Sequence, residues 1–276
     1  MGLHFTKMHG LGNDFIVINA IQQTIQLTPK NIQALSRRDT GIGFDQCLLV
    51  EKSKQPNIDF FYRIFNANGT SVGQCGNGAR CLARFIEHYA LSPKKTLRVA
   101  TITTELTLHL NHDGSVTVDM GHPVWEPSHI PLNTPHIADR YTLPLSQHAP
   151  VHVHAVALGN PHAVMHVRDL KQAPVALLGP QIETHPHFPE HVNVGFFEID
   201  TSDHILLRVH ERGTGETRAC GSGAAAAAAV GRRFYGLDAH IRVSLPGGDV
   251  WVDWLDHADS LKLTGPAEFV YEGKLF

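Results

Sequence analysis

Two cysteines stand in the same local sequence, a Cys-Gly-x-Gly element that follows a loop and precedes a helix-like segment. The elements are Cys75–Gly78 and Cys220–Gly223. Glycines let a backbone approach a ligand closely, and the first turn of a helix offers N–H groups and a positive dipole end to a carboxylate. The same field is expected to lower the pKa of a cysteine placed there. The sequence therefore predicts two activated thiols that flank one substrate.

Two acid/base groups on opposite faces of one carbon suit the removal and return of a proton with inversion. One cysteine, as thiolate, would take the α-proton, and the other, as thiol, would protonate the far face. An unperturbed cysteine has a pKa of about 8.5, close to the operating pH. Helix N-termini that hold the carboxylate would stabilise the carbanion electrostatically. Because no lysine stands in a convincing Schiff-base context, the expected reaction is a racemisation or epimerisation that uses no cofactor.

Other uses of the pair remain open at this point. A disulfide between Cys75 and Cys220 would lock the structure, and a redox sensor would form one reversibly. A two-domain binding protein would capture an amino acid without any need for a thiol. A redox enzyme more often carries a short Cys-x-x-Cys, which this sequence lacks. Cys47 and Cys81 are expected to be core residues, because free cysteines are usually buried.

The cysteine elements belong to an internal repeat. Phe60–Asn66 and Ile205–Glu211 are similar strand-like segments, 145 residues apart as measured from Arg63 to Arg208, and each lies nine residues before its cysteine. Upstream, an offset of 147 relates Leu11-Gly12-Asn13 to Leu158-Gly159-Asn160, and Gln46 to Asn193. Several matches in order at nearly one offset predict two similar domains that arose by duplication.

The pattern of the remaining sequence is mixed α and β. Dense β-branched and aromatic residues predict strands at 15–19, 47–51, 58–65, 97–102, 105–110 and 115–120. Three helices are expected, one capped by Thr28 with Pro29 in its first turn, one from Gly76, and one over Ala224–Ala229. The Pro-rich segment 123–150 places the connection near its start, so the expected domains are residues 1–120 and 121–265.

Composition excludes several classes of protein. The chain has 276 residues, 42% of them apolar, and a formal charge of −3 without basic or acidic runs, so neither nucleic acid nor a membrane is an expected partner. The start does not resemble a signal peptide, which points to the reducing cytoplasm and free thiols. Among the 20 histidines, His152 with His154 and His185 with His187 and His191 lack a ligand spacing that completes a metal site. A solvated strand face is expected at His152 and His154, and no metal.

Long segments of the chain resemble the diaminopimelate epimerase family. They are Lys7–Phe15, Tyr62–Ala67, Gln74–Cys81, Gly159–His162, Val192–Asn193, Glu211–Thr217 and Ala219–Gly223, within a similarity from about Leu3 to Glu272. The resemblance implies interconversion of LL- and meso-diaminopimelate, in bacterial lysine and peptidoglycan precursor synthesis. A two-cysteine proline or hydroxyproline racemase is the nearest alternative. Its substrate has no second amino-acid end and would not need Glu211 and Arg212.

The resemblance also implies a role for individual residues. Cys75 and Cys220 would be catalytic, with His162 and Glu211 tuning the thiols or polarising the site. The substrate would be gripped by Asn13, Gln46, Asn66, Asn160, Asn193, Glu211 and Arg212, and its reacting carboxylate by the backbone N–H groups of Gly76, Asn77, Gly221 and Ser222. The guanidinium of Arg212 can bind a distal carboxylate through two parallel bonds, and Glu211 can pair with an ammonium.

The implied fold is two similar α/β domains, each with β-strands wrapped around a central helix and the active site in the cleft between them. The C-terminal residues 266–276 would return to the first domain. Tyr271 lies in a segment that resembles the family's dimer contact, so a homodimer is expected. The chain departs from the family pattern at Asn68, where an aspartate is common, and at Gly73, where a larger residue is common. Both departures are expected to alter the flexibility of the loop before Cys75.

Overall fold

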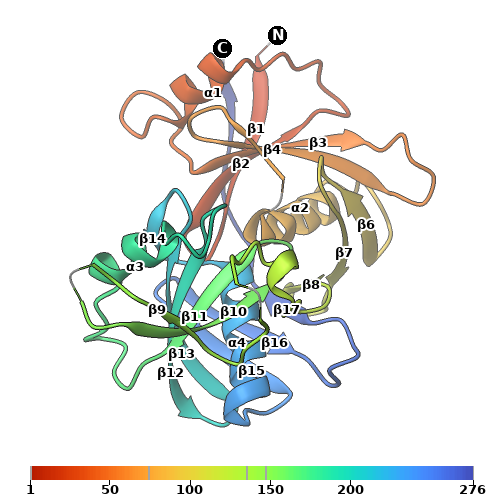
Figure 1. The fold of residues 1–276 in the computed structure, drawn as a ribbon. Helices are drawn as coiled ribbons and strands as arrows, with labels where there is room; N and C mark the ends of the chain where they lie inside the picture. Colours follow the sequence, from red (N-terminus) through yellow and green to blue (C-terminus); the bar gives the residue numbers. More distant parts are fainter. Residues whose placement is uncertain (1, 74, 135, 147, 276) are drawn as a thin grey trace. The chain divides into compact units, whose positions relative to one another are not determined.

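A computed structural model describes residues 2–73, 75–134, 136–146 and 148–275 of the chain. Gln74, which belongs to one of the segments that resemble the family, lies outside these residues. The chain divides into two compact units, the first formed by residues up to Val118 together with those from Thr264 onward, and the second by Asp119–Leu263. Figure 1 shows the elements of both units along the chain.

The strands of the first unit form a continuous series of pairings. They are β1 (Leu3–Gly10), β2 (Asn13–Asn19), β3 (Gln46–Lys52), β4 (Phe60–Asn66), β5 (Ser71–Val72), β6 (Thr96–Ala100), β7 (Glu105–Leu110), β8 (Val116–Asp119) and β18 (Glu268–Leu275). β18 pairs antiparallel with β1 and β1 with β2, β2 runs parallel to β3, and β3 pairs antiparallel with β4. β4 continues to β5 and β6, and β7 pairs with both β6 and β8. The last strand of the chain thus lies beside the first.

Two helices complete the first unit. α1 (Pro29–Ser36) begins at the predicted cap, where the Thr28 hydroxyl accepts from the Asn31 N–H. α2 (Gly76–His88) packs against β1, β2, β3 and β7, and its residues from Asn77 to Ile86 are buried except Arg84. A helix that is buried nearly all round belongs in a core, which is where the first cysteine element therefore begins.

The second unit repeats this arrangement. Its strands are β9 (Tyr141–Leu143), β10 (Val151–Ala157), β11 (Pro161–His166), β12 (Asn193–Thr201), β13 (His204–Glu211), β14 (Gly215–Thr217), β15 (His240–Leu245) and β16 (Gly248–Asp253), and β17 (Lys262–Gly265) follows at the boundary. β10 pairs antiparallel with β9 and β11, β11 runs parallel to β12, and β12 pairs antiparallel with β13. β13 continues to β14 and β15, and β15 pairs with β16.

The helices of the second unit are α3 (Val175–Glu183) and α4 (Gly221–Tyr235), with a 3-10 turn at Pro127–His129. α4 contains the predicted alanine run, is buried from Gly221 to Gly231 except Ser222, and packs against six strands, from β10 to β16 without β14. It ends at Gly236, whose left-handed φ of 71° suits glycine. None of the helices in the described part of the chain is both long and apolar enough to cross a membrane.

The two units share their register as well as their strand order. Phe15 faces Gln46 in the parallel pair β2–β3, and His162 faces Asn193 in the parallel pair β11–β12. The turns before β2 and β11 both carry a glycine with positive φ, 84° at Gly12 and 76° at Gly159. The offset of 147 found in the sequence therefore corresponds to equivalent positions in the two units.

Candidate active site

The first cysteine element places a thiol at the start of α2. Cys75 is the N-cap residue with extended backbone, and its Sγ accepts a hydrogen bond from the Gly78 N–H at 3.4 Å. Gly76 and Asn77 supply the N–H groups of the first turn, which by position lie outside the helix's own hydrogen-bond ladder. The Cys75 Sγ lies 3.9 Å from Asn13 Oδ1. The predicted boundary between loop and helix at this cysteine is confirmed.

The second element repeats the first. Cys220 is the N-cap of α4, and its Sγ accepts from the Gly223 N–H at 3.4 Å. Ser222 Oγ lies 3.7 Å from the same sulfur. A Cβ on Gly223 would stand 2.9 Å from Val209 Cγ2 and 3.2 Å from Cys220 Sγ, so glycine is required for the close approach. Each unit therefore presents one sulfur bound to the third residue of a helix.

The prediction that the helix N-terminus lowers the thiol pKa is wrong for Cys220. Burial raises the pKa of this thiol well above its ordinary value, and the negative charge of Glu211 raises it further. Bonds from the Gly223 N–H and the Ser222 hydroxyl act in the opposite direction but do not offset this. These surroundings favour the neutral thiol form of Cys220. Cys47 and Cys81 are fully buried, as predicted.

Amide side chains of the first unit are hydrogen-bonded in pairs, and one of these pairs lies beside Cys75. Asn13 Oδ1 accepts from Asn77 Nδ2 at 3.2 Å and faces the thiol, while Asn13 Nδ2 donates to Asp45 Oδ2 at 3.0 Å. Gln46 and Asn66 face each other across β3 and β4 and are joined by a bond of 2.9 Å from Gln46 Nε2 to Asn66 Oδ1. The three predicted amide side chains of this unit, together with Asn77, whose backbone N–H was predicted to bind, thus form two bonded pairs.

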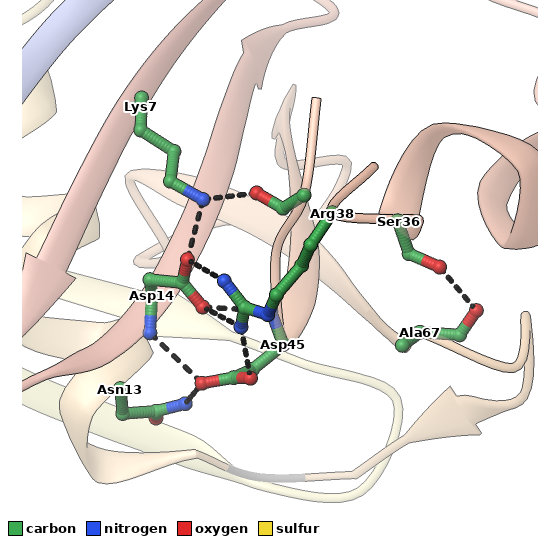
Figure 2. A network of polar contacts seen from close by, with 8 residues as sticks. Lys7, Asn13, Asp14, Ser36, Arg38, Asp45 and Ala67 are labelled. Carbon is green, nitrogen blue, oxygen red and sulfur yellow. Dashed lines mark hydrogen bonds and ion pairs between the residues drawn. The ribbon is translucent and has the colours of Figure 1, made fainter. Parts of the chain in front are cut away.

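A network of charged side chains holds Asn13 through its hydrogen bond to Asp45 (Figure 2). Asp45 accepts from Asn13 and from Arg38, and Arg38 binds both oxygens of Asp14 at 2.8 and 2.9 Å. Lys7 Nζ donates to Asp14 at 2.5 Å and to the Gly43 carbonyl. Because Asp45 can accept but not donate, it turns the Asn13 carbonyl toward Cys75. No role for these charges was predicted from the sequence, although Lys7 and Asp14 lie in a segment that resembles the family.

The loop before Cys75 is more constrained than its departures from the family pattern suggested. Asn68 Oδ1 accepts from the Thr70 N–H and hydroxyl at 3.0 and 2.6 Å, which closes the turn after β4. The Gly73 carbonyl accepts from Thr101 Oγ1 at 2.6 Å, and a Cβ on Gly73 would lie 2.8 Å from Thr103 Cγ2. Gly73 therefore allows tight packing against the β6–β7 turn.

The second unit carries a different set of groups. His162 is fully buried, and its Nε2 lies 3.1 Å from Asn160 Oδ1. Burial lowers the pKa of His162 to about 3, with a further contribution from the charge of Arg212, so the imidazole is neutral at neutral pH. Asn193 donates to the Pro161 carbonyl at 3.2 Å and accepts from the Arg212 N–H at 2.9 Å. Asn193 thus ties two strands to the segment that follows β13.

Glu211 and Arg212 stand where β13 ends. Glu211 Oε1 accepts from Thr217 Oγ1 at 2.5 Å, and Arg212 donates from its guanidinium to the Glu190 carbonyl at 2.9 Å. Glu183 on α3 anchors the same turn, since it accepts from the Gly213 N–H at 2.8 Å and lies 2.7 Å from His210 Nε2. The role of Glu183 was not predicted from the sequence, because the segment that forms α3 carries no clear helical periodicity of apolar residues.

One histidine expectation is wrong. His152 is exposed, but His154 is 3% exposed, stacks on Phe234 with ring centroids 4.5 Å apart and lies 3.1 Å from Tyr235 Oη. Burial lowers the pKa of His154 to about 4. His154 is buried because the aromatic residues at the end of α4 cover it. Within the described ranges, no cluster of three or more His, Cys, Asp or Glu side chains is placed to hold a metal.

Comparisons with known proteins show the family of the chain. The family model described as diaminopimelate epimerase matches residues 5–126 and 154–270. A curated diaminopimelate epimerase of Legionella pneumophila (strain Paris) is 56% identical over 275 residues, which cover 100% of this chain and 99% of the relative. The protein from the Philadelphia 1 strain is equally similar, at 56% over 275 residues.

Solved structures share the fold at much lower identity. A hydroxyproline epimerase from Agrobacterium vitis superposes with a TM-score of 0.72 at 14% identity, covering 99% of this chain and 92% of the other. A PhzF-family phenazine biosynthesis protein from Bacillus anthracis gives 0.69 at 16% identity, covering 100% and 99%. These structures establish the mixed α/β fold alone. The family model and the 56% identity also establish the family. The chain belongs to the diaminopimelate epimerase family.

Proposed function

We propose that this chain, an isomerase of lysine biosynthesis, interconverts LL-2,6-diaminopimelate and meso-2,6-diaminopimelate with two thiols and no cofactor. The observation that carries the mechanism is the pair of equivalent sulfurs, each at a helix N-terminus and each bound to the third N–H of its helix at 3.4 Å. Sequence identity of 56% to curated diaminopimelate epimerases supports the substrate. The meso product would also serve peptidoglycan precursor synthesis, and we place the enzyme in the cytoplasm.

In the proposed step, one thiolate takes the proton from the α-carbon as the C–H bond breaks. The electron pair passes into the adjacent carboxylate, which the N–H groups of Gly76, Asn77, Gly221 and Ser222 stabilise. The opposite thiol then gives its proton to the other face of the carbon and is left as the new thiolate. The mechanism requires the substrate to bind between two domains that correspond to the two units, with one sulfur on each side of the carbon.

The distal amino-acid end distinguishes this substrate from proline. A carboxylate there suits the guanidinium of Arg212, an ammonium suits Glu211, and the amides Asn13, Gln46, Asn66, Asn160 and Asn193 can donate and accept. His162, which is buried and neutral, would act on the reacting end through Asn160. The hydroxyproline epimerase with the same fold binds trans-4-hydroxy-L-proline, which has no second end to be recognised.

Replacing Arg212 with alanine is expected to weaken substrate binding more than it slows the chemical step. A hydrogen bond to a charged group contributes about 1.5–3 kcal/mol, so KM should rise by roughly 10- to 100-fold while kcat changes little. The backbone bond from Arg212 N–H to Asn193 does not depend on the side chain and should survive. Steady-state kinetics in both directions would measure the effect, and Arg212→Lys should be intermediate. An unchanged KM would contradict the assignment of Arg212 to the distal carboxylate.

The reaction itself is tested by solvent exchange. The reduced protein is incubated with LL-diaminopimelate in D2O without added metal or cofactor, and the α-proton signal is followed together with the meso product. Deuterium should enter the product at one carbon. Exchange with proline or hydroxyproline in place of diaminopimelate would overturn the substrate but keep the two-thiol mechanism. An absence of exchange with every amino acid tested would favour a binding protein.

We also propose that the chain is a homodimer whose contact includes β18. Tyr271 and Val270 on this strand are 45% and 53% exposed, which is high for large apolar side chains. The Tyr271 ring meets the edge of Phe5 with centroids 6.0 Å apart, so the exposed ring is supported from β1. Light scattering should give the molar mass of two chains, and a single-chain mass at micromolar concentration would exclude a stable dimer.

A further inference from the structure

The two cysteine elements differ in the charged residues that stand at equivalent positions of the two repeats. Five residues after Cys75 stands Arg80, whereas five residues after Cys220 stands Ala225. Nine residues before Cys75 stands Asn66, whereas nine residues before Cys220 stands Glu211. One thiol thus has a cation on its own helix, and the other has an anion on the strand before it.

Arg80 is a fully buried cation. Its side chain is 0% exposed, its Nε donates to the Pro266 carbonyl at 3.1 Å, and one guanidinium nitrogen donates to Asn77 Oδ1 at 2.9 Å. The other terminal nitrogen has no hydrogen-bond partner among the described residues, and no ion pair between them includes Arg80. A buried charge without an opposite charge costs several kcal/mol, so this position favours an anion close by.

Among the groups that interact with the charge of Arg80, Cys75 is the one that can carry the opposite charge. The charge of Arg80 interacts with Cys81 and with Cys75, and Cys75 interacts in turn with Tyr62 on β4. Burial raises the pKa of both Cys81 and Tyr62 far above neutrality, so both are uncharged. Cys75 is less buried and accepts the Gly78 N–H.

Other charges near α2 are already paired or exposed. Glu268 on β18 acts on Cys81, but it is exposed, where solvent screens its charge. On the strands packed against α2, the ion pairs are Lys7 with Asp14, Glu51 with Arg63 and Glu105 with Arg98. Asn77 lies between the two groups, since its Oδ1 accepts from Arg80 and its Nδ2 donates to Asn13 Oδ1, which lies 3.9 Å from Cys75 Sγ.

The surroundings of Cys220 have the opposite sign. Glu211 raises the pKa of this thiol, and Ala225 offers no charge where Arg80 stands in the other unit. Two buried histidines on the strands against α4, His162 and His154, are neutral, since burial lowers the pKa of His162 to about 3 and that of His154 to about 4. Most other titratable groups on these strands have partners of their own, namely Arg208 with Glu216, His204 with Asp200, His240 with Asp253, Arg242 with Asp249 and His210 with Glu183. Glu198 on β12 accepts from the Leu170 N–H.

We propose that Arg80 is a positioning residue that keeps Cys75 as the thiolate of the ligand-free enzyme, while Cys220 rests as the thiol. The proposal rests on the two-thiol function and assigns its starting state. The epimer whose α-hydrogen faces Cys75 therefore binds to an enzyme in which Cys75 is already the thiolate that removes this proton. After each inversion the sulfurs have exchanged charge, and the cation of Arg80 favours return of the proton to Cys220.

The test is a titration of each thiol in the ligand-free protein. Alkylation by iodoacetamide is followed across pH, and peptide mass spectrometry reports each cysteine separately. In the unmodified sequence the midpoint for Cys75 should lie below that for Cys220. Because Cys220 is 4% exposed, ultraviolet absorbance of the thiolate in Cys75→Ala and Cys220→Ala provides a readout that needs no access for reagent. The pKa of Cys47 is raised to about 12, which removes it from the range of interest.

Arg80 is then replaced by a neutral side chain of similar length. Arg80→Met should raise the Cys75 midpoint by about 1–3 pH units, the effect of an opposite charge nearby, and leave that of Cys220 in place. Arg80→Lys, which keeps the charge, should restore the low midpoint. Circular dichroism checks the fold of each variant.

Two results would overturn the proposal. The first is a Cys220 midpoint equal to or below that of Cys75 in the unmodified protein, a comparison that depends on no variant. The second is a folded Arg80→Met protein whose Cys75 midpoint does not move. Neither measurement uses turnover, so failure here is distinct from failure of the D2O exchange test, which concerns the proposed function.

Discussion

Cys75→Ala and Cys220→Ala are each expected to reduce epimerisation to background. A positioned acid or base contributes roughly 10²–10⁴-fold to rate, and inversion needs one group on each face of the carbon. The thiol that remains can still remove and return a proton on its own face. Each variant should therefore exchange the α-hydrogen of one epimer slowly, without forming the other. Chiral chromatography and proton NMR in D2O would measure both reactions in one sample.

Cys81→Ala is the matched control for this experiment. Cys81 lies on the same helix as Cys75, six residues further on, and is fully buried. Its replacement removes packing but no reacting group, so turnover should persist in the folded protein. Normal epimerisation by either Cys75→Ala or Cys220→Ala would contradict the two-base mechanism.

Asp14→Asn is expected to cause the largest loss of stability among substitutions near the site. Asp14 accepts from Lys7, from both terminal nitrogens of Arg38 and from the Asp45 N–H. Lys7 and Asp14 are 9% and 15% exposed, so removal of one charge leaves a nearly buried ammonium without its counter-ion. Breaking a buried pair from one side costs about 3–5 kcal/mol in the free energy of unfolding. Urea unfolding monitored by circular dichroism would measure it.

The same pair predicts how this stability depends on pH. Burial alone would raise the pKa of Asp14, but bonds from Arg38 and Lys7 outweigh it and hold the pKa well below its usual value. The stabilisation is therefore complete above the unfolded pKa of about 3.9 and is lost as the pH falls toward the folded value. The difference between the original protein and Asp14→Asn should shrink below about pH 4.

Asp59→Asn is the control for exposure. Asp59 is 18% exposed, close to the 15% of Asp14, and also accepts from the Arg98 N–H, but its partner Lys94 is 60% exposed. Because water solvates this ammonium when the pair is broken, the loss should be nearer the value typical of surface pairs, about 0–1 kcal/mol. An equal loss of stability in Asp59→Asn and Asp14→Asn would contradict the importance of burial in the Lys7–Asp14 pair.

The elements that carry the thiols were predictable because their signals are local. Thr28 and Pro29 determine where α1 begins through hydrogen bonding and a fixed φ, and both act within one turn of chain. The apolar stripe after Cys75 and the alanine run after Cys220 both predict helices, and both helices are present. The strand at Glu105–Leu110 was predicted with the observed bounds, because its alternation is strict.

Groups that act across the fold were not predictable in this way. Arg38, Asp45 and Glu183 acquire their roles from partners 24 to 31 residues away, and nothing in the spacing of single residues reports such contacts. The raised pKa of Cys220 has the same origin, since burial by α4 and the charge of Glu211 outweigh the local field of the helix. Similarly, the sequence could not show that Phe234 and Tyr235 cover His154.

The pairing of β18 with β1 bears on how the chain is made. Leu3 faces Leu275 in this pair, so the first unit needs the last residues of the chain to complete its sheet. The second unit is one continuous segment, Asp119–Leu263, and has all its strands before those residues are synthesised. During translation domains usually fold in order from the N-terminus. Here the order of completion is reversed, because the unit that contains Cys75 gains its β18 strand only after the whole of the second unit has been synthesised.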